Sequence, residues 1–121
     1  MKKLITTILL PLGIASLSGQ SKNSSKEIEF KFKDPKNTAC FVCMHVFNKS
    51  KPILYVTHDS DGYWQFLCGE DHHSEDNIKV ISLLQAVTLD ATINDLYKMP
   101  LNTGAERKKI NEKWVPFNIS E

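Results

Sequence analysis

Within residues 26–33, charged and hydrophobic side chains alternate strictly from Glu27 onward. Ile28, Phe30 and Phe32 fall on one face of an extended chain, and lysines and glutamates fall on the other, so this segment predicts a half-buried β-strand. Residues 39–47 are apolar on both faces. A strand that is covered on both faces has this pattern, which predicts a central position in a sheet.

Turn-forming residues separate two further strands. Residues 53–57 are rich in β-forming side chains, and residues 63–68 place Trp64, Phe66 and Cys68 on one face. The Asp-Ser-Asp-Gly sequence between these strands predicts a hairpin turn, and it lacks the later acidic residues of a calcium-binding loop. Together with residues 39–47, the two strands predict a three-stranded antiparallel meander.

Helix-capping residues mark the second half of the chain. A short strand is expected at residues 78–81, after which Ser82 is placed to cap a helix. Asp90 caps a second short helix that stops before Pro100, and residues 107–117 predict a last hairpin. The predicted fold class is therefore α+β, an antiparallel sheet made of the meander and terminal strands, with one or two short helices packed on one face.

The N-terminus has the three parts of a secretory signal peptide. Lys2 and Lys3 form a positive n-region, residues 4–17 form an apolar run, and small residues follow up to Gly19. The run is shorter than the roughly 20 residues of a membrane-spanning helix. We therefore expect an exported protein, periplasmic or secreted, with no membrane span after cleavage. The expected organisation is a signal peptide at 1–19, a flexible leader and first strand at 20–37, a single α+β domain at 38–117 and a tail at 118–121.

Charge is balanced over the chain but uneven along it. There are 15 Lys and Arg residues against 14 Asp and Glu residues, which gives no electrostatic basis for nucleic-acid binding. Residues 59–76, however, contain six acidic residues and neither Lys nor Arg. These acids either lie in solvated loops or form a patch for a protein partner with a basic surface. The residues predicted to contact such a partner are Trp64, Glu70, Asp71, Glu75 and Asp76.

Cysteine and histidine residues cluster in two short segments. The first is Cys40-x-x-Cys43-x-His45, and the second is Cys68-x-x-x-His72-His73. Such a set supplies the thiolate and imidazole ligands of a tetrahedral structural Zn²⁺ site. A strand would place Cys40 and Cys43 on opposite faces. The smaller set that two neighbouring strands can bring together is therefore the predicted metal site: Cys43, His45, Cys68 and His72.

Other roles for these cysteines stay open. Cysteines of exported proteins tend to oxidise, and Cys43 and Cys68 are placed to form a disulfide across the sheet. Buried free thiols that pack as small hydrophobic side chains are a further possibility. An enzyme that uses Cys43 or Cys68 with a histidine is disfavoured, because the Cys-x-x-Cys segment is predicted as a strand and not as a helix N-terminus that lowers a thiol pKa. We therefore expect no catalytic residue and, apart from the structural Zn²⁺, no cofactor.

From residue 61 onward, an aspartate-containing turn is followed by an aromatic strand with Trp64 and Phe66, then by Gly69-Glu70 and, later, by Glu106-Arg107. In these residues the sequence resembles a family of small bacterial domains of unknown function, some of which are described as immunity proteins of polymorphic toxin systems. The resemblance covers roughly residues 38–117 and implies a non-enzymatic sheet-plus-helix domain that binds a toxin-like protein. Tyr63 departs from the family pattern, which has Gly before the Trp, and a signal peptide is unusual for proteins that act in the cytoplasm. The matching residues are Trp64, Phe66, Gly69, Glu70, Asn77, Leu84, Asp90, Leu96, Pro100, Gly104, Glu106 and Arg107.

Overall fold

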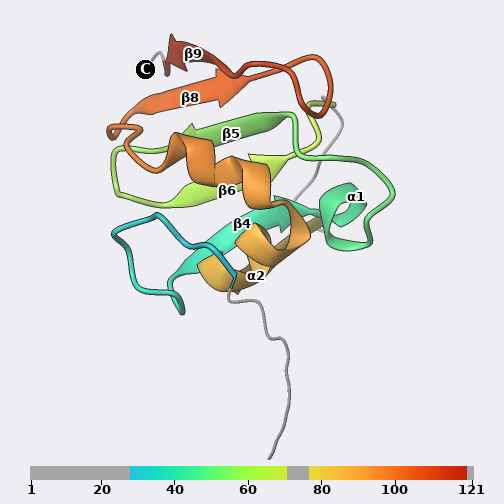
Figure 1. Cartoon of the computed structure of the whole chain (residues 1–121), viewed down its shortest axis with the longest axis horizontal. Helices are drawn as coiled ribbons and strands as arrows, with labels where there is room; N and C mark the ends of the chain where they lie inside the picture. The colour runs from blue at the N-terminus through green and yellow to red at the C-terminus, as the bar shows by residue number, and fades with distance from the viewer. Residues whose placement is uncertain (1–27, 71–76, 120–121) are drawn as a thin grey trace, which may run out of the picture.

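The structure is a computed structural model that describes residues 28–70 and 77–119. The expected signal peptide therefore lies outside the described residues. Within them, no helix is long and apolar enough to cross a membrane. The elements, in chain order, are β4 (Ala39–Cys43), α1 (Met44–Phe47), β5 (Tyr55–His58), β6 (Trp64–Leu67), β7 (Ile78–Ser82), α2 (Leu83–Leu89), the 3-10 helix η2 (Ala91–Leu96), β8 (Thr103–Glu106) and β9 (Val115–Asn118) (Figure 1).

A six-stranded sheet forms the frame of the domain, in the order β7-β4-β6-β5-β8-β9. Strands β4 and β6 are parallel, and every other neighbouring pair is antiparallel. The α+β class with a mostly antiparallel sheet is confirmed. The predicted meander is wrong, because β6 lies between β4 and β5. The strand with the fully buried Trp64 and Phe66 thus takes the inner position.

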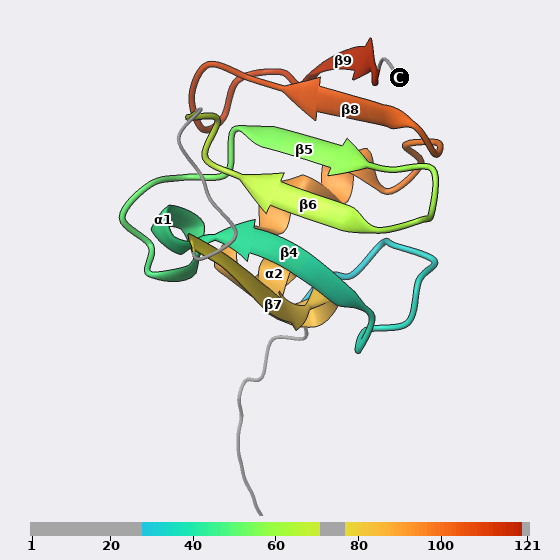
Figure 2. The same cartoon turned by 180° about the vertical axis from the view of Figure 1, so that it is seen from behind.

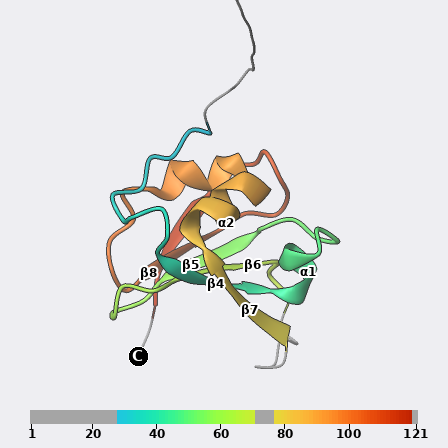
Figure 3. The same cartoon turned by 90° about the horizontal axis from the view of Figure 1, so that it is seen from below.

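Both longer helices lie on the same side of the sheet. Figure 3 shows α2 and the neighbouring η2 on one face, and Figure 2 shows the opposite face without a helix over it. The helix side chains Leu83, Val87 and Ile93 are at most 1% exposed and pack with Val42 and Phe66 of the sheet in one core. Burial of these apolar groups is the main stabilising contribution to the domain.

The predicted helix caps are confirmed. Ser82 and Gln85 form a reciprocal capping box at the start of α2, with hydrogen bonds of 3.1 and 2.9 Å. The carboxylate of Asp90 accepts the backbone N–H of Thr92 at 2.9 Å and so begins η2. The hairpin between β5 and β6 is also confirmed, with Gly62 at a φ of 93° in its turn.

The described part of the predicted first strand, residues 28–33, is not a strand. Its backbone bonds instead to the side chain of Asn94, which accepts the N–H of Lys31 at 2.9 Å and donates to the carbonyl of Glu29 at 3.0 Å. Phe32 is buried edge-on against Trp64, with ring centroids 5.0 Å apart. The alternation therefore marks a buried face, but an amide side chain takes the place of a neighbouring strand.

The apolar segment 39–47 divides into two elements. Strand β4 is paired on both sides, as predicted, but it ends at Cys43, and the single-turn helix α1 follows. The C-terminus does form a hairpin, the β8–β9 pair, but the predicted bounds are wrong for its first strand, because β8 spans Thr103–Glu106 and ends before residue 107. Asn111, in the connection, has a φ of 74°, which suits the expected turn.

A buried arginine joins the sheet to the helical layer. Arg107 is 6% exposed, forms an ion pair of 2.8 Å with Asp90 and donates twice to the carbonyl of Ile53, at 3.1 and 2.9 Å. It also donates to the hydroxyl of Thr92 and lies 4.0 Å from the ring centroid of Trp114. Because its charge is paired and its donors are engaged, this residue belongs to the framework of the fold.

Candidate metal centre

The parallel pairing of β4 and β6 brings two cysteines to the same edge of the sheet. Cys43 is the last residue of β4, and Cys68 directly follows β6. The arrowheads of both strands point toward α1 in Figure 2. Since neighbouring strands are only about 4.8 Å apart, the carboxyl ends of this pair place the two side chains within reach of each other. Helix α1 then adds His45.

Three candidate ligand atoms converge at this point. The sulfur atoms of Cys43 and Cys68 and a ring nitrogen of His45 all lie within 4.8 Å of one another. Nδ1 of His45 lies 3.4 Å from the sulfur of Cys68. Cys43 is fully buried, Cys68 is 4% exposed, and His45 is half-buried. A small cation at the centre of this triangle would be largely shielded from water.

Cys40 does not join the cluster. It is fully buried in the helix-covered core, where desolvation raises the pKa of its thiol to about 12. Cys40 therefore packs as a neutral, small hydrophobic group. The strand geometry that separates Cys40 from Cys43 was predicted from the alternation of side chains.

The loop after α1 fixes the position of His45. The carbonyl oxygen of His45 accepts the backbone N–H groups of Ser50 and Lys51, at 2.9 and 3.2 Å, and the hydroxyl of Ser50, at 3.3 Å. These bonds hold the ends of the loop together and limit the movement of the imidazole. Lys51 also forms an ion pair with Glu70, which follows Cys68. The two segments that carry the ligands are thus linked outside the triangle.

Burial keeps the thiol of Cys68 protonated when no cation is bound. Desolvation is the main cause of its raised pKa, and the thiol of Cys43 and the charge of Glu70 add to it. The backbone N–H of Glu70 donates to the sulfur and opposes the shift. A raised pKa and 4% exposure do not fit a reactive catalytic thiolate. They do fit a ligand that loses its proton only to a metal.

The other predicted site residues have different positions. His72, predicted as the fourth ligand, lies outside the described residues, as do the predicted partner contacts Asp71, Glu75 and Asp76. The described residues include all three cysteines, and no disulfide joins any two of them, so the predicted Cys43–Cys68 bridge does not form.

Trp64 was predicted as a partner contact, but the structure buries it. Its side chain is 1% exposed, stacked on His58 and packed against Phe66. The hairpin pattern puts Trp64 on the same face as Phe66, which is the face that the helices cover. Glu70 is half-buried and pairs with Lys51.

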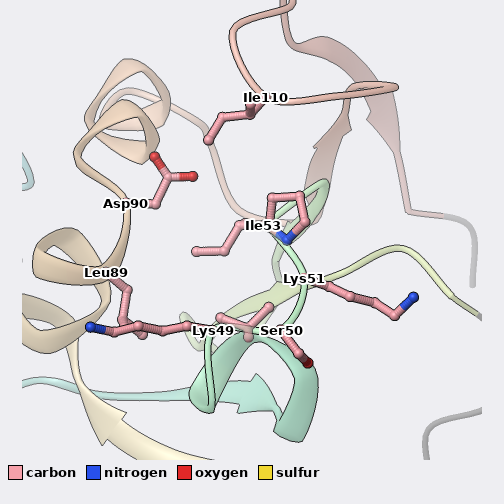
Figure 4. Close-up of a pocket in the computed structure, with 9 residues that line it drawn as sticks. Lys49, Ser50, Lys51, Ile53, Leu89, Asp90 and Ile110 are labelled. Atoms are coloured by element: carbon pink, nitrogen blue, oxygen red, sulfur yellow. The ribbon is translucent and has the colours of Figure 1, made fainter.

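A cavity of about 340 Å³ lies on the other side of α1. Figure 4 shows Asp90, Leu89 and Ile110 around this space, while Lys51 points away from it. The carboxylate of Asp90 is fully used, because Thr92 and Arg107 donate to it. The only acidic residue among the described ones that line this cavity therefore serves the fold, and the Cys43–His45–Cys68 triangle is the stronger candidate for chemistry.

No protein-family model matches the chain, and no curated protein or solved structure matches it significantly. The functional argument therefore depends on the geometry of the site.

Proposed function

We propose that the protein is a small, exported, non-enzymatic domain whose fold is stabilised by one Zn²⁺ ion bound to Cys43, His45 and Cys68. The observation that supports this proposal is the convergence of two sulfur atoms and an imidazole nitrogen within 4.8 Å at the ends of two parallel strands. Three such groups on rigid elements form most of a tetrahedral site before any ion arrives.

The donor set favours zinc among the common metals. Thiolate and imidazole are ligands for borderline-soft ions, whereas Ca²⁺ and Mg²⁺ require oxygen ligands. Zn²⁺ in structural sites takes four ligands, and the sequence predicts His72 as the fourth. The burial of Cys43 and Cys68 favours a closed, structural site over an open, catalytic one. Bound zinc would add its binding free energy to the stability of a domain with a modest core.

Elemental analysis of the exported protein tests the proposal. We expect about one zinc per chain in the wild type, and substoichiometric zinc in Cys43→Ala and Cys68→Ala. Cys40→Ala is the matched control, because it also removes a buried cysteine but lies outside the triangle, so it should keep the metal. Substoichiometric zinc in the wild type, with a Tm that a chelator does not change, would rule the zinc site out.

A protein-binding role is the second candidate, and the uncovered sheet face favours it. Phe41, Tyr55 and Phe117 lie on the face opposite the buried Val42 and Val56, with Val80 63% exposed beside Phe41. Tyr55 and Phe117 are in ring contact at 5.3 Å. Apolar side chains gathered on an uncovered face are typical of protein interfaces. The resemblance to immunity-like domains also predicts a toxin-like partner.

Capture of a partner from the native host tests this second role. Val80→Glu, on the uncovered face, should abolish capture of the partner. Ile110→Glu, which changes a side chain that is 47% exposed at the cavity beside α1, should not. Equal capture by both variants would exclude the uncovered face as the interface.

A further inference from the structure

A large cavity lies at the opposite end of β6 from Cys68. Its volume is about 770 Å³, which is within the usual range of sites for small organic ligands, roughly 300–1,000 Å³. It is formed by the segment before β4, the β5–β6 hairpin and the loop after η2. Three segments that are distant in sequence thus contribute to one concave surface. The residues that line it include Lys31, Lys33, His58, Trp64, Tyr97 and Lys98.

An aromatic stack forms one wall of this cavity. The rings of His58 and Trp64 are stacked with centroids 3.8 Å apart and planes within 8°. Nδ1 of His58 lies 2.9 Å from the carbonyl oxygen of Met99. Because a carbonyl only accepts, Nδ1 carries the proton, and this bond fixes the imidazole in its stacked position. This part of the wall is therefore aromatic and preorganised.

Trp64 has an unsatisfied donor at this wall. It is 1% exposed, and its indole N–H has no hydrogen-bond partner within residues 28–70 and 77–119. Buried donors are nearly always paired, and an unpaired donor costs free energy. An acceptor atom that reaches this N–H would recover part of this free energy.

The rim of the cavity is positively charged. Three lysines, Lys31, Lys33 and Lys98, line it, against one acidic residue, Asp34. The ammonium groups of Lys31 and Lys98 lie 5.6 and 5.5 Å from the centroid of the Tyr97 ring. Lys31 also contacts Glu29 at 3.9 Å, but both side chains are largely exposed, so this pair is weak and readily exchanged. Two cations beside one ring favour the binding of an anionic group near this ring.

We propose that this cavity binds a small organic anion. Its apolar body packs against the His58–Trp64 wall, and its anionic group lies near Tyr97 between Lys31 and Lys98. This site is separate from the metal centre, because the two are at opposite ends of β6. Binding here neither requires the zinc ion nor supplies a ligand to it.

The two tryptophans allow a direct test by NMR. The indole N–H of Trp114 is also buried and without a partner in the described chain, but it lines a different cavity. The probe is naphthalene-2-carboxylate, titrated into the purified protein, with the indole signals assigned through Trp114→Phe. We expect the Trp64 indole signal to shift and saturate, and the Trp114 signal to stay in place. A stationary Trp64 signal, or equal shifts of both, would overturn the proposal.

Matched probes and variants separate the two parts of the site. Neutral naphthalene-2-carboxamide and inorganic phosphate should each bind about tenfold or more weakly than the carboxylate, and Lys31→Gln with Lys98→Gln should weaken carboxylate binding by a similar factor. Lys113→Gln, on the Trp114 cavity, is the control and should leave it unchanged. If the carboxamide binds as tightly, the lysines have no role. If phosphate binds as tightly as the carboxylate, the aromatic wall has no role. Either result contradicts the proposal.

Discussion

Nδ1 of His45 lies 3.4 Å from the sulfur of Cys68, although one residue belongs to helix α1 and the other follows strand β6. This contact depends on the order of the strands. If β5 lay between β4 and β6, as in a meander, Cys43 and Cys68 would be about 9–10 Å apart, two strand spacings, and would not share an ion. The parallel β4–β6 pair thus makes a three-ligand site possible.

Metal affinity should rise with pH. Burial raises the pKa of Cys68, so the thiol is protonated at neutral pH and must lose its proton to bind Zn²⁺. Raising the pH from 7 to 8 should therefore increase the apparent affinity for Zn²⁺ by at least about tenfold, because each displaced proton contributes one factor of ten. Competition with a chromophoric chelator measures this slope. A pH-independent affinity would mean that Cys68 is not a ligand.

Cys40 should make the metal-free domain sensitive to alkali. Its pKa is raised from 9.0 to about 12, so above pH 9 the unfolded chain releases a proton that the folded chain keeps, and stability falls. The stabilising contribution is complete below pH 9 and is lost as the pH rises toward 12. The loss from this thiol is about 1.4 kcal/mol between pH 8 and pH 10.

Urea unfolding of wild type and Cys40→Ala at both pH values isolates this effect, because the other titrating groups are common to the two proteins. The difference in unfolding free energy should shrink by the stated amount between pH 8 and pH 10. A difference that does not change with pH would show that Cys40 is accessible to water or titrates normally.

Arg107 should be essential for stability. Its replacement by Met leaves the carboxylate of Asp90 with only 9% side-chain exposure and no cation, and breaks the bonds to the Ile53 carbonyl. Loss of one partner of a buried ion pair typically costs about 3–5 kcal/mol. Lys at this position should rescue little, because it lacks the planar donor fork. Thermal unfolding measures both variants.

Lys108→Met is the control for this experiment, because Lys108 is adjacent but exposed. Its unfolding free energy should stay within about 0.5 kcal/mol of the wild type. If Arg107→Met were equally mild, the buried network would not be part of the framework of the fold.

The sequence predicts the local features of this fold well. Ser82 and Asp90 cap their helices as expected, because capping depends on side chains within three residues of the cap. The hairpin turn before Tyr63 is equally local: Asp59 accepts the backbone N–H groups of Asp61 and Tyr63, each at 2.9 Å. Alternation also identified Trp64 and Phe66 as one face of a strand.

The features that the sequence does not predict depend on distant partners. Nothing local to residues 28–33 indicates that Asn94 will take the place of a neighbouring strand. An apolar run such as 39–47 fits a buried strand or a buried helical turn equally well, so the end of β4 at Cys43 was missed. The spacing of Cys43, His45 and Cys68 identified the right residues, but their convergence required the actual strand order.

X-ray absorption at the zinc K-edge tests the central claim most directly. For protein purified from the exported fraction, we predict a four-coordinate zinc with two sulfur ligands at about 2.3 Å and the remaining nitrogen or oxygen ligands at about 2.0–2.1 Å. Cys68→Ala should leave no ordered two-sulfur site, while Cys40→Ala should give the wild-type spectrum. A sulfur count other than two, or a spectrum of hydrated zinc with only oxygen ligands, would contradict a metal centre built from Cys43, His45 and Cys68.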